Sequence, residues 1–196
     1  MPQISSVCVF CGSSVGADPA YMATARRTGE VLASQGVTLV FGGGGVGLMG
    51  QVADAALMAG GKVIGVIPEL LVRKELGHAA LTELRVVKTM HERKQSMADL
   101  SDAFMALPGG FGTFEEFCEI LTWAQLGLHS KPCGLLNAKG YYDKLLAMFD
   151  HAVQEQFVHP RYRGLILTED DPARLLEEMR KYRAPIVEKW LTPEST

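Results

Sequence analysis

Residues 102–127 read DAFMALPGGFGTFEEFCEILTWAQLG, and this stretch decides the fold. The apolar run Ala103–Leu107 is too short for a helix and is stopped by Pro-Gly-Gly at 108–110, so it predicts a buried strand. Beyond the glycines, apolar residues recur at helical spacing, with Glu115 and Glu119 on the opposite side. The stretch therefore predicts a strand, a glycine-rich turn and a helix.

Thr113 stands where we expect the N-cap of this helix. Thr113-x-x-Glu116 is also a capping-box pattern, in which each side chain satisfies the backbone N–H of the other residue, so both have a purely structural explanation. The glycines exceed what a cap needs, and their entropic cost is tolerated where a ligand approaches the main chain. A helix N-terminus behind a parallel strand offers free N–H groups to an anion. We therefore expect a phosphate on the N–H groups of Gly109, Gly110, Gly112 and Thr113 and on the Thr113 hydroxyl.

The bulk composition limits the class of protein. With 196 residues, 47% hydrophobic and 21% charged, the chain can bury a sizeable core. We expect one domain over residues 1–196, with a short tail at 184–196. The net charge of -3 argues against a general binder of nucleic acid polymers or membrane surfaces, so the expected partner is a small molecule. No segment resembles a signal peptide or a transmembrane helix, which predicts a cytoplasmic protein.

Cysteine and histidine spacing indicates neither a disulfide framework nor a metal site. Four cysteines are too few for such a framework at this length. Cys8 and Cys11 form C-x-x-C, but a spacing of three within a strand sends their side chains to opposite faces, so we expect no redox function. The five histidines show no ligand spacing with one another or with cysteine. We expect no metal and no cofactor.

Strand and helix patterns alternate along the whole chain. Strands are predicted at Val7–Cys11, Val37–Phe41, Lys62–Ile67, Leu84–Lys88, Ala103–Leu107, Cys133–Leu136 and Leu165–Leu167. Helices are predicted at Pro19–Gln35, from a glycine loop to Ala59, from Met90 to about Leu100, from Thr113 to Gly127, at Tyr141–Gln156, and from Pro172 to about Tyr182. Residues 69–80 are predicted as a loop or short helix. The alternation predicts an α/β fold, a Rossmann-like doubly wound parallel sheet of about seven strands with helices on both faces. Such sheets bind ligands beyond the carboxyl ends of their strands.

A second glycine loop, GGGGVGLMG at 42–50, follows the second predicted strand. Gly42, Gly44 and Gly47 fit G-x-G-x-x-G, with Glu69 about twenty residues on, which leaves a dinucleotide-dependent oxidoreductase open as an alternative. Against it, this is the second strand-to-helix turn of the chain rather than the first. The P-loop pattern, which ends in Lys and Ser or Thr, is absent from the sequence. The residues expected to share a nucleotide with the first glycine loop are Ser14, Gly44 and Gly45.

Four motifs together resemble one enzyme family. PGGFGTFEE at 108–116 resembles the PGGxGTxxE signature of the LONELY GUY (LOG) family, the cytokinin-activating nucleoside 5′-monophosphate phosphoribohydrolases. The segments VCVFCGSS, GGGGVGLMG and MHERK are similar to that family's other blocks and occur in the same order. The resemblance spans roughly residues 7–183. Proteins of this kind are sometimes labelled lysine decarboxylases, but nothing in the sequence indicates a pyridoxal phosphate site.

The resemblance implies hydrolysis of the N-glycosidic bond of N6-substituted adenosine 5′-monophosphates, with AMP itself as a further candidate substrate, to free base and ribose 5-phosphate. It implies that Arg93 and Glu116 are the catalytic pair. Cleavage builds positive charge on the ribose, which a carboxylate such as Glu116 stabilises. A cation such as Arg93 offsets the repulsion between that carboxylate and a bound phosphate. If the family resemblance is set aside, Arg93 has a second explanation as a surface charge on a helix.

Further expectations concern the base, a cover and assembly. A mainly apolar base pocket is expected near Met90, Met97 and Leu107, although methionines at such positions also serve as core residues. The loop Val158–Gly164 is a candidate cover whose position the sequence leaves open. The resemblance and the wide apolar arc of Phe114–Gly127 predict a homodimer. A non-catalytic nucleotide-binding or carrier protein of the same fold remains an alternative.

Overall fold

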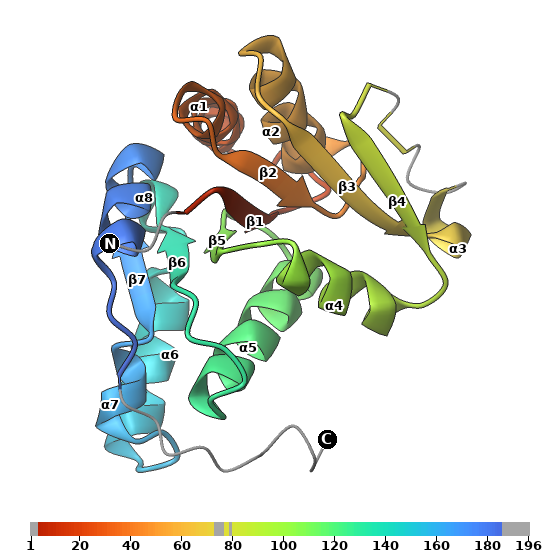
Figure 1. Cartoon of the computed structure of the whole chain (residues 1–196). Helices are drawn as coiled ribbons and strands as arrows, with labels where there is room; N and C mark the ends of the chain where they lie inside the picture. Colours follow the sequence, from red (N-terminus) through yellow and green to blue (C-terminus); the bar gives the residue numbers. More distant parts are fainter. Residues whose placement is uncertain (1–3, 73–76, 79, 186–196) are drawn as a thin grey trace.

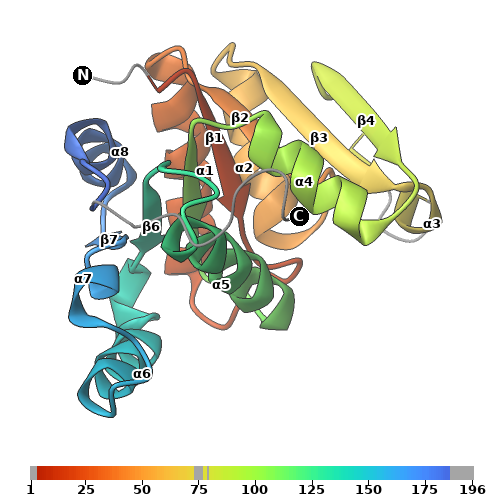
Figure 2. The same ribbon diagram turned by 60° about the horizontal axis from the view of Figure 1, so that its bottom comes forward.

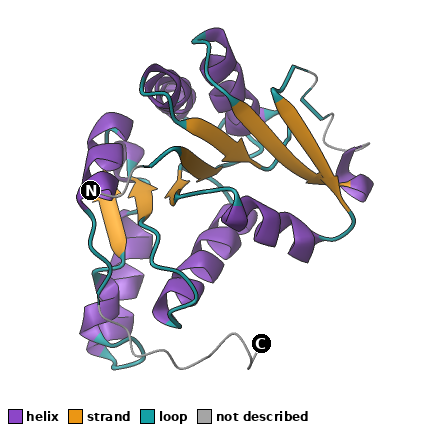
Figure 3. Ribbon diagram, viewed as in Figure 1, coloured by secondary structure: helices purple, strands orange, loops and turns teal. Residues whose placement is uncertain are grey.

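The computed structural model describes residues 4–72, 77–78 and 80–185 of the chain. Within that range, seven strands form one parallel sheet in the order β4-β3-β2-β1-β5-β6-β7 (Figures 1 and 3). The strands are Ser6–Phe10 (β1), Thr38–Phe41 (β2), Val63–Pro68 (β3), Glu83–Val87 (β4), Ala103–Ala106 (β5), Cys133–Leu136 (β6) and Ile166–Glu169 (β7). The predicted parallel α/β sheet is confirmed, and each strand ends within about two residues of its predicted position.

Helices lie on both faces of the sheet, as predicted (Figures 1 and 2). They are α1 (Pro19–Ser34), α2 (Gly47–Met58), α3 (Glu69–Val72), α4 (Met90–Asp99), α5 (Phe111–Gln125), the 3₁₀ helix η1 (Ala138–Gly140), α6 (Asp143–Gln154), α7 (Pro160–Arg163) and α8 (Pro172–Lys181). The side chains of α1, α2 and α8 pack on one face, and those of α4, α5 and α6 on the other. The sequence did not predict η1 and α7, because helices this short show no periodicity.

Strand β1 shows how the sheet divides its side chains between two cores. Val7 and Val9 are buried on the α1 and α2 side, whereas Cys8 and Phe10 are buried on the α4 and α5 side. Cys11 belongs to the same core as Val7 and Val9, so the two cysteines of the C-x-x-C do lie on opposite faces.

The order of the strands reverses beside β1. The chain runs outward from β1 through β2 and β3 to β4, then returns to place β5 on the other side of β1. The loops that follow β1 and β5 therefore leave neighbouring strands in opposite directions, and the N–H of Gly12 donates to the carbonyl of Pro108 at 3.0 Å between them. Open α/β sheets bind ligands at this kind of reversal point.

Some predicted segments fall partly outside the described residues. Of the 69–80 segment, α3 occupies the beginning, and 73–76 and 79 lie outside the described range. Of the tail predicted at 184–196, residues 186–196 also lie outside it. Among the helices described, none has both the length and the apolar character required to cross a membrane.

Candidate active site

Helix α5 begins earlier than the sequence suggested. Its first helical residue is Phe111, and Gly110 is the N-cap, with no side-chain cap hydrogen bond. Thr113 is therefore the third helical residue, and the prediction that it is the N-cap is wrong. The Pro-Gly-Gly turn ends at Gly110, and the helical conformation begins at the next residue, Phe111. The Thr113 side chain is buried instead against Gly109, where any Cβ would lie 2.1 Å from the Thr113 Oγ1.

The capping chemistry predicted at Thr113 and Glu116 is found one motif earlier. The Thr89 hydroxyl accepts from the N–H of Glu92 at 3.1 Å, and the Glu92 carboxylate accepts from the N–H of Lys88 at 2.8 Å. These two bonds satisfy backbone N–H groups at the start of α4 and thereby cap the helix. Because Thr113 does not cap α5, the capping-box explanation of Glu116 falls away.

The start of α5 leaves room for a ligand. A Cβ built on Gly110 or on Gly112 would meet no heavy atom of the described residues within 4 Å, and neither residue has a positive φ. Packing and backbone conformation therefore give no reason for glycine at either position. Among the described residues, no hydrogen bond uses the N–H groups of Gly110, Gly112 or Thr113. Free N–H groups at the positive end of a helix dipole form an anion site.

Arg93 is a buried cation just beyond the last paired residues of β2 and β3, Phe41 and Gly65. Only 7% of the residue is exposed. Its Nε donates to the Val66 carbonyl at 3.1 Å and its Nη2 to the Gly42 carbonyl at 3.1 Å. A Cβ on Gly42 would lie 2.0 Å from Nη2, so a side chain there would displace the guanidinium from this position. The surface-charge explanation of Arg93 is wrong, because the guanidinium is held at the carboxyl edge of the sheet.

Glu116 is a partly buried carboxyl near that cation. Burial raises the pKa of Glu116 to about 7, while the charges of Arg93 and Lys94 act in the opposite direction. Both members of the Arg93–Glu116 pair lie in the described part of the chain, and they form no direct ion pair. A carboxyl with a pKa near neutrality can exist in either protonation state during a reaction.

Lys94 fixes the helix that carries Glu116. Its Nζ bonds Glu115 at 2.7 Å and Glu119 at 2.9 Å, which joins α4 to α5. The negative charges of these two glutamates also raise the pKa of Glu116, so Lys94 counters them. We did not predict Lys94 from the sequence. The feature of the sequence that could have indicated Lys94 is its position directly after Arg93 in MHERK.

A hollow of about 440 Å³ lies at the reversal point of the sheet. It is lined by residues of the loops after β1 and β5, by Leu48 of α2 and by two tyrosines: Gly12, Ser13, Ser14, Gly16, Ala17, Tyr21, Leu48, Pro108, Gly109, Gly110 and Tyr141. The structure therefore brings the predicted Ser14 together with the predicted Gly109 and Gly110. Sequence reasoning did not identify the tyrosines.

The second glycine loop, 42–50, is largely explained by packing. A Cβ on Gly47 would lie 2.3 Å from the carbonyl carbon of Ser13, and the N–H of Leu48 at the start of α2 donates to Gly12 at 3.0 Å. Gly44 pairs with Gly77 in an isolated antiparallel bridge. Gly44 and Gly45 do not line the hollow beside Ser14. At the start of α2 the Leu48 N–H is bonded to Gly12 and Ser13 packs against Gly47, so this helix start is not free for a pyrophosphate. The dinucleotide alternative therefore loses its main support.

The three residues predicted for the base pocket do not come together. Met97 and Leu107 are 2% and 0% exposed, in the cores on opposite faces of the sheet. Met97 lies in the last turns of α4 and packs into the core beneath that helix, whereas Leu107, directly after β5, packs into the core on the opposite face. Only Met90, which is 43% exposed and has its Sδ 3.8 Å from Arg93 Nη1, lies at the edge of the site.

The segment Val158–Gly164 lies away from the site. It precedes β7 and therefore lies at the amino edge of the sheet, where Arg163 pairs with Asp150 of α6 at 2.6 Å. Tyr162 and Arg163 line a groove with Cys118 and Thr122, in the second half of α5. The segment does not cover the glycine turn.

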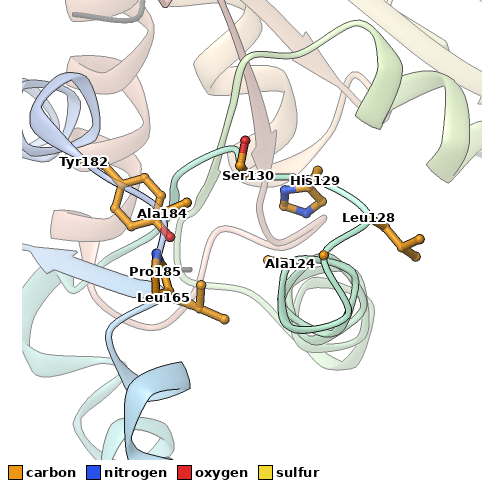
Figure 4. A pocket seen from close by; sticks show the side chains of 9 residues that line it. Ala124, Leu128, His129, Ser130, Leu165, Tyr182, Ala184 and Pro185 are labelled. Carbon is orange, nitrogen blue, oxygen red and sulfur yellow. The ribbon is translucent and has the colours of Figure 1, made fainter. Parts of the chain in front are cut away.

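Another hollow, of about 340 Å³, also lies at the amino edge, between the end of α5 and the start of β6 (Figure 4). Its imidazole, His129, is bonded through both ring nitrogens, to the Ile120 carbonyl at 2.9 Å and to the N–H of Lys131 at 3.1 Å. Burial lowers the pKa of His129. Within the described residues no three His, Cys, Asp or Glu side chains gather as metal ligands.

Comparison with known proteins identifies the family. A family model described as "Possible lysine decarboxylase" matches residues 49–179. A probable cytokinin riboside 5′-monophosphate phosphoribohydrolase of Oryza sativa subsp. japonica, LOGL9, is 51% identical over 176 residues, which cover 90% of this chain and 78% of that protein. The cytokinin riboside 5′-monophosphate phosphoribohydrolase LOG3 of Arabidopsis thaliana is 47% identical over 186 residues, covering 95% and 86%. This chain belongs to the LOG family.

Solved structures that resemble this LOG-family chain confirm its fold. The molybdenum cofactor binding protein of Rippkaea orientalis matches with a TM-score of 0.69 at 23% identity, covering 91% of this chain and 97% of that one. The Moco carrier protein of Chlamydomonas reinhardtii matches with a TM-score of 0.68 at 22% identity, with the same coverage. At these identities the likeness shows the fold alone.

Gly112→Ala separates ligand binding from stability in this LOG-family site. Alanine at an exposed helical position is favoured over glycine by about 1 kcal/mol, so we expect the free energy of unfolding in urea to stay equal or rise. The added methyl enters the open space before the free N–H groups, so the affinity for AMP, measured by calorimetry, should fall. The matched control Gly164→Ala lies at the amino edge and should bind AMP like the wild type. An unchanged AMP affinity in Gly112→Ala would place the ligand elsewhere.

Glu116→Gln should change how stability depends on pH. The pKa of Glu116 is about 7 in the folded protein against an ordinary value of 4.5, so between these values the folded state holds a proton that the unfolded chain has released. The stability that this proton provides is complete below pH 4.5 and is lost as the pH rises to about 7. We expect the glutamine variant to exceed the wild type in unfolding free energy more at pH 8 than at pH 5. The exposed Glu155→Gln is the control, and the same difference at both pH values for Glu116→Gln would contradict the burial of its charge.

Proposed function

We propose that this LOG-family protein hydrolyses the N-glycosidic bond of N6-substituted adenosine 5′-monophosphates, releasing the free base and ribose 5-phosphate. The observation that carries the proposal is a partly buried carboxyl, Glu116, one turn past a helix start with free N–H groups and near the buried cation Arg93. The named activity of relatives at 47% to 51% identity supports the same reaction.

The 5′-phosphate binds at the start of α5. The free N–H groups of Gly110, Gly112 and Thr113 donate to its oxygens, and the helix dipole adds to the attraction. Ser14, across the hollow, supplies a further hydroxyl. A riboside without the phosphate gains none of these interactions, so the site selects the monophosphate.

Glu116 acts on the sugar. As the C1′–N9 bond breaks, its electron pair leaves with the base and positive charge develops on the ribose ring. The ionised Glu116 carboxylate stabilises this charge and accepts a proton from the water that adds to C1′. The base takes up one proton and leaves, so one water is divided between the two products.

Arg93 balances the charge of the site. A phosphate and an ionised Glu116 near the same helix repel each other, by roughly 3 kcal/mol for two unit charges about 6 Å apart at an effective dielectric of 20. The guanidinium offsets part of this repulsion. Two carbonyls fix the position of the guanidinium. Among the hydrogen bonds of the described residues, its Nη1 contacts only Met90 Sδ, so this nitrogen is available to a ligand.

The expected partner is thus a free nucleotide, and we propose that the protein works in the cytoplasm without a cofactor, a membrane or a nucleic acid polymer. The net charge of -3 supports a small ligand over a polymer. The four cysteines are free thiols, as is usual in a reducing compartment.

Isopentenyladenosine monophosphate should release free base on incubation with the protein, as followed by chromatography. The matching riboside should not, because it lacks the phosphate, and AMP tests the need for an N6 substituent. Glu116→Gln and Arg93→Ala should each lower the rate by about a hundredfold or more, the usual size for such groups. The exposed Glu155→Gln is the control. Release of no base from any nucleotide would refute the activity.

The outcome also separates the alternatives. A nucleotide that binds and stays intact would indicate a carrier protein of the same fold. A melting temperature raised by NAD or FAD but not by monophosphates would indicate an oxidoreductase.

We also propose a homodimer. The apolar arc of α5 is partly used within the chain, because Phe114, Leu121 and Trp123 pack against the core with α4 and α6. Exposed apolar side chains gather at the carboxyl edge beside the site, where Phe111 is 92% exposed and Met90 and Val46 are also exposed. A second copy would cover this surface beside the site.

Light scattering at micromolar concentration should give twice the monomer mass of 21.3 kDa. Phe111→Ser should weaken the association, whereas Met58→Ser, which changes an exposed methionine on α2, should not. A monomeric mass for the wild type would contradict the dimer.

A further inference from the structure

The stretch Leu107–Gly109, which leads through the glycine turn into α5, accepts three hydrogen bonds from distant parts of the chain. The Tyr142 hydroxyl donates to the Leu107 carbonyl at 2.5 Å, the N–H of Gly12 donates to the Pro108 carbonyl at 3.0 Å, and the Tyr141 hydroxyl donates to the Gly109 carbonyl. Three successive carbonyls are thus bonded within the protein. The N–H groups that follow them are left for a ligand.

The bond from Tyr141 fixes a direction as well as a position. All described peptide bonds are trans, so the carbonyl of Gly109 and the N–H of Gly110 point in opposite directions from one rigid plane. A donor on the carbonyl therefore orients the N–H. Glycine on both sides of the peptide allows many orientations of this plane, so an external donor is needed to select one.

The structure holds Tyr141 firmly in place for this bond. Its ring packs edge-on against Tyr21 at 5.7 Å and against Tyr142 at 5.0 Å between centroids. The chain reaches it through two successive residues with positive φ, Lys139 at 53° and Gly140 at 71°. Such a conformation is costly for lysine, and it is found where the surroundings enforce it.

Contacts on both sides enforce that turn. The Asn137 side chain accepts from the N–H of Tyr142 at 2.7 Å and donates to Asp143 at 2.8 Å. Lys139 pairs with Asp18, the N-cap of α1, at 3.0 Å. The turn between β6 and α6 therefore connects α1 to the glycine turn after β5, and Tyr141 also lines the 440 Å³ hollow.

We propose that Tyr141 is the positioning residue of the phosphate site: its hydroxyl orients the Gly109–Gly110 peptide so that the Gly110 N–H faces the phosphate. This inference rests on the proposed function for the identity of the ligand. Tyr142, buried one residue further on, anchors the end of β5 and makes no bond to the Gly109–Gly110 peptide.

Tyr141→Phe tests the proposal, because it removes the hydroxyl and keeps the ring packing. Loss of one such hydrogen bond corresponds to about a tenfold change. We expect KM for isopentenyladenosine monophosphate to rise by about this factor, with kcat within about twofold of the wild type. The affinity for ribose 5-phosphate, measured by calorimetry, should fall in parallel. The control Tyr162→Phe, whose hydroxyl meets Arg161 at the amino edge, should change neither quantity.

The outcomes separate this inference from the proposed function. An unchanged KM in a Tyr141→Phe protein with normal circular dichroism would overturn it, and so would a loss confined to kcat, which would place the hydroxyl at the reacting atoms. If the wild type binds ribose 5-phosphate but cleaves no nucleotide, the proposed function fails. In that case a tenfold weaker binding by Tyr141→Phe would still support the positioning residue, and equal binding would refute it.

Discussion

The arrangement of the site depends on one buried charge. A guanidinium removed from water is strongly unfavourable unless its donors are bonded, and the carbonyls at the ends of parallel strands are acceptors that the sheet leaves open. Arg93 uses two of them, from Gly42 and Val66. These bonds fix α4 against β2 and β3, leave no room for a side chain at Gly42 while the guanidinium stays in place, and bring a positive charge near Glu116 of α5. Lys94, the next residue, then joins α4 to α5 through two glutamates.

The phosphate half and the sugar half of the site are built differently. At the start of α5 the groups offered to a ligand are backbone N–H groups, held by bonds to the carbonyls behind them. One turn later the groups are side chains, Glu116 and Arg93, and burial sets their properties. The first half gives affinity for any phosphate, whereas the second acts only on a sugar that develops positive charge.

The sequence predicted those parts of the fold in which apolar residues recur at a regular spacing or in which glycine or proline ends a segment. All seven strands and the longer helices follow from apolar runs bounded by glycine and proline, as in the stretch 102–127. The start of α5 was misplaced because Thr113-x-x-Glu116 and Thr89-x-x-Glu92 have the same pattern, and local spacing does not tell which pair caps a helix. Met97 and Leu107 were assigned to a pocket because the sequence does not show which face of the sheet each one meets. Tyr141 was missed for a similar reason, since its bond to Gly109 joins residues 32 positions apart.

The early start of α5 has a geometric consequence. With Phe111 as its first residue, the helix places Glu116 four residues after Gly112, a rise of about 6 Å along its axis. That is on the scale of the separation between the phosphorus and C1′ of a nucleoside 5′-monophosphate. A nucleotide whose phosphate lies on the first turn would then have its glycosidic bond about one turn further along the helix. The helix would in this way set the separation between the phosphate site and the Glu116 carboxylate, and this separation would match the length of the sugar.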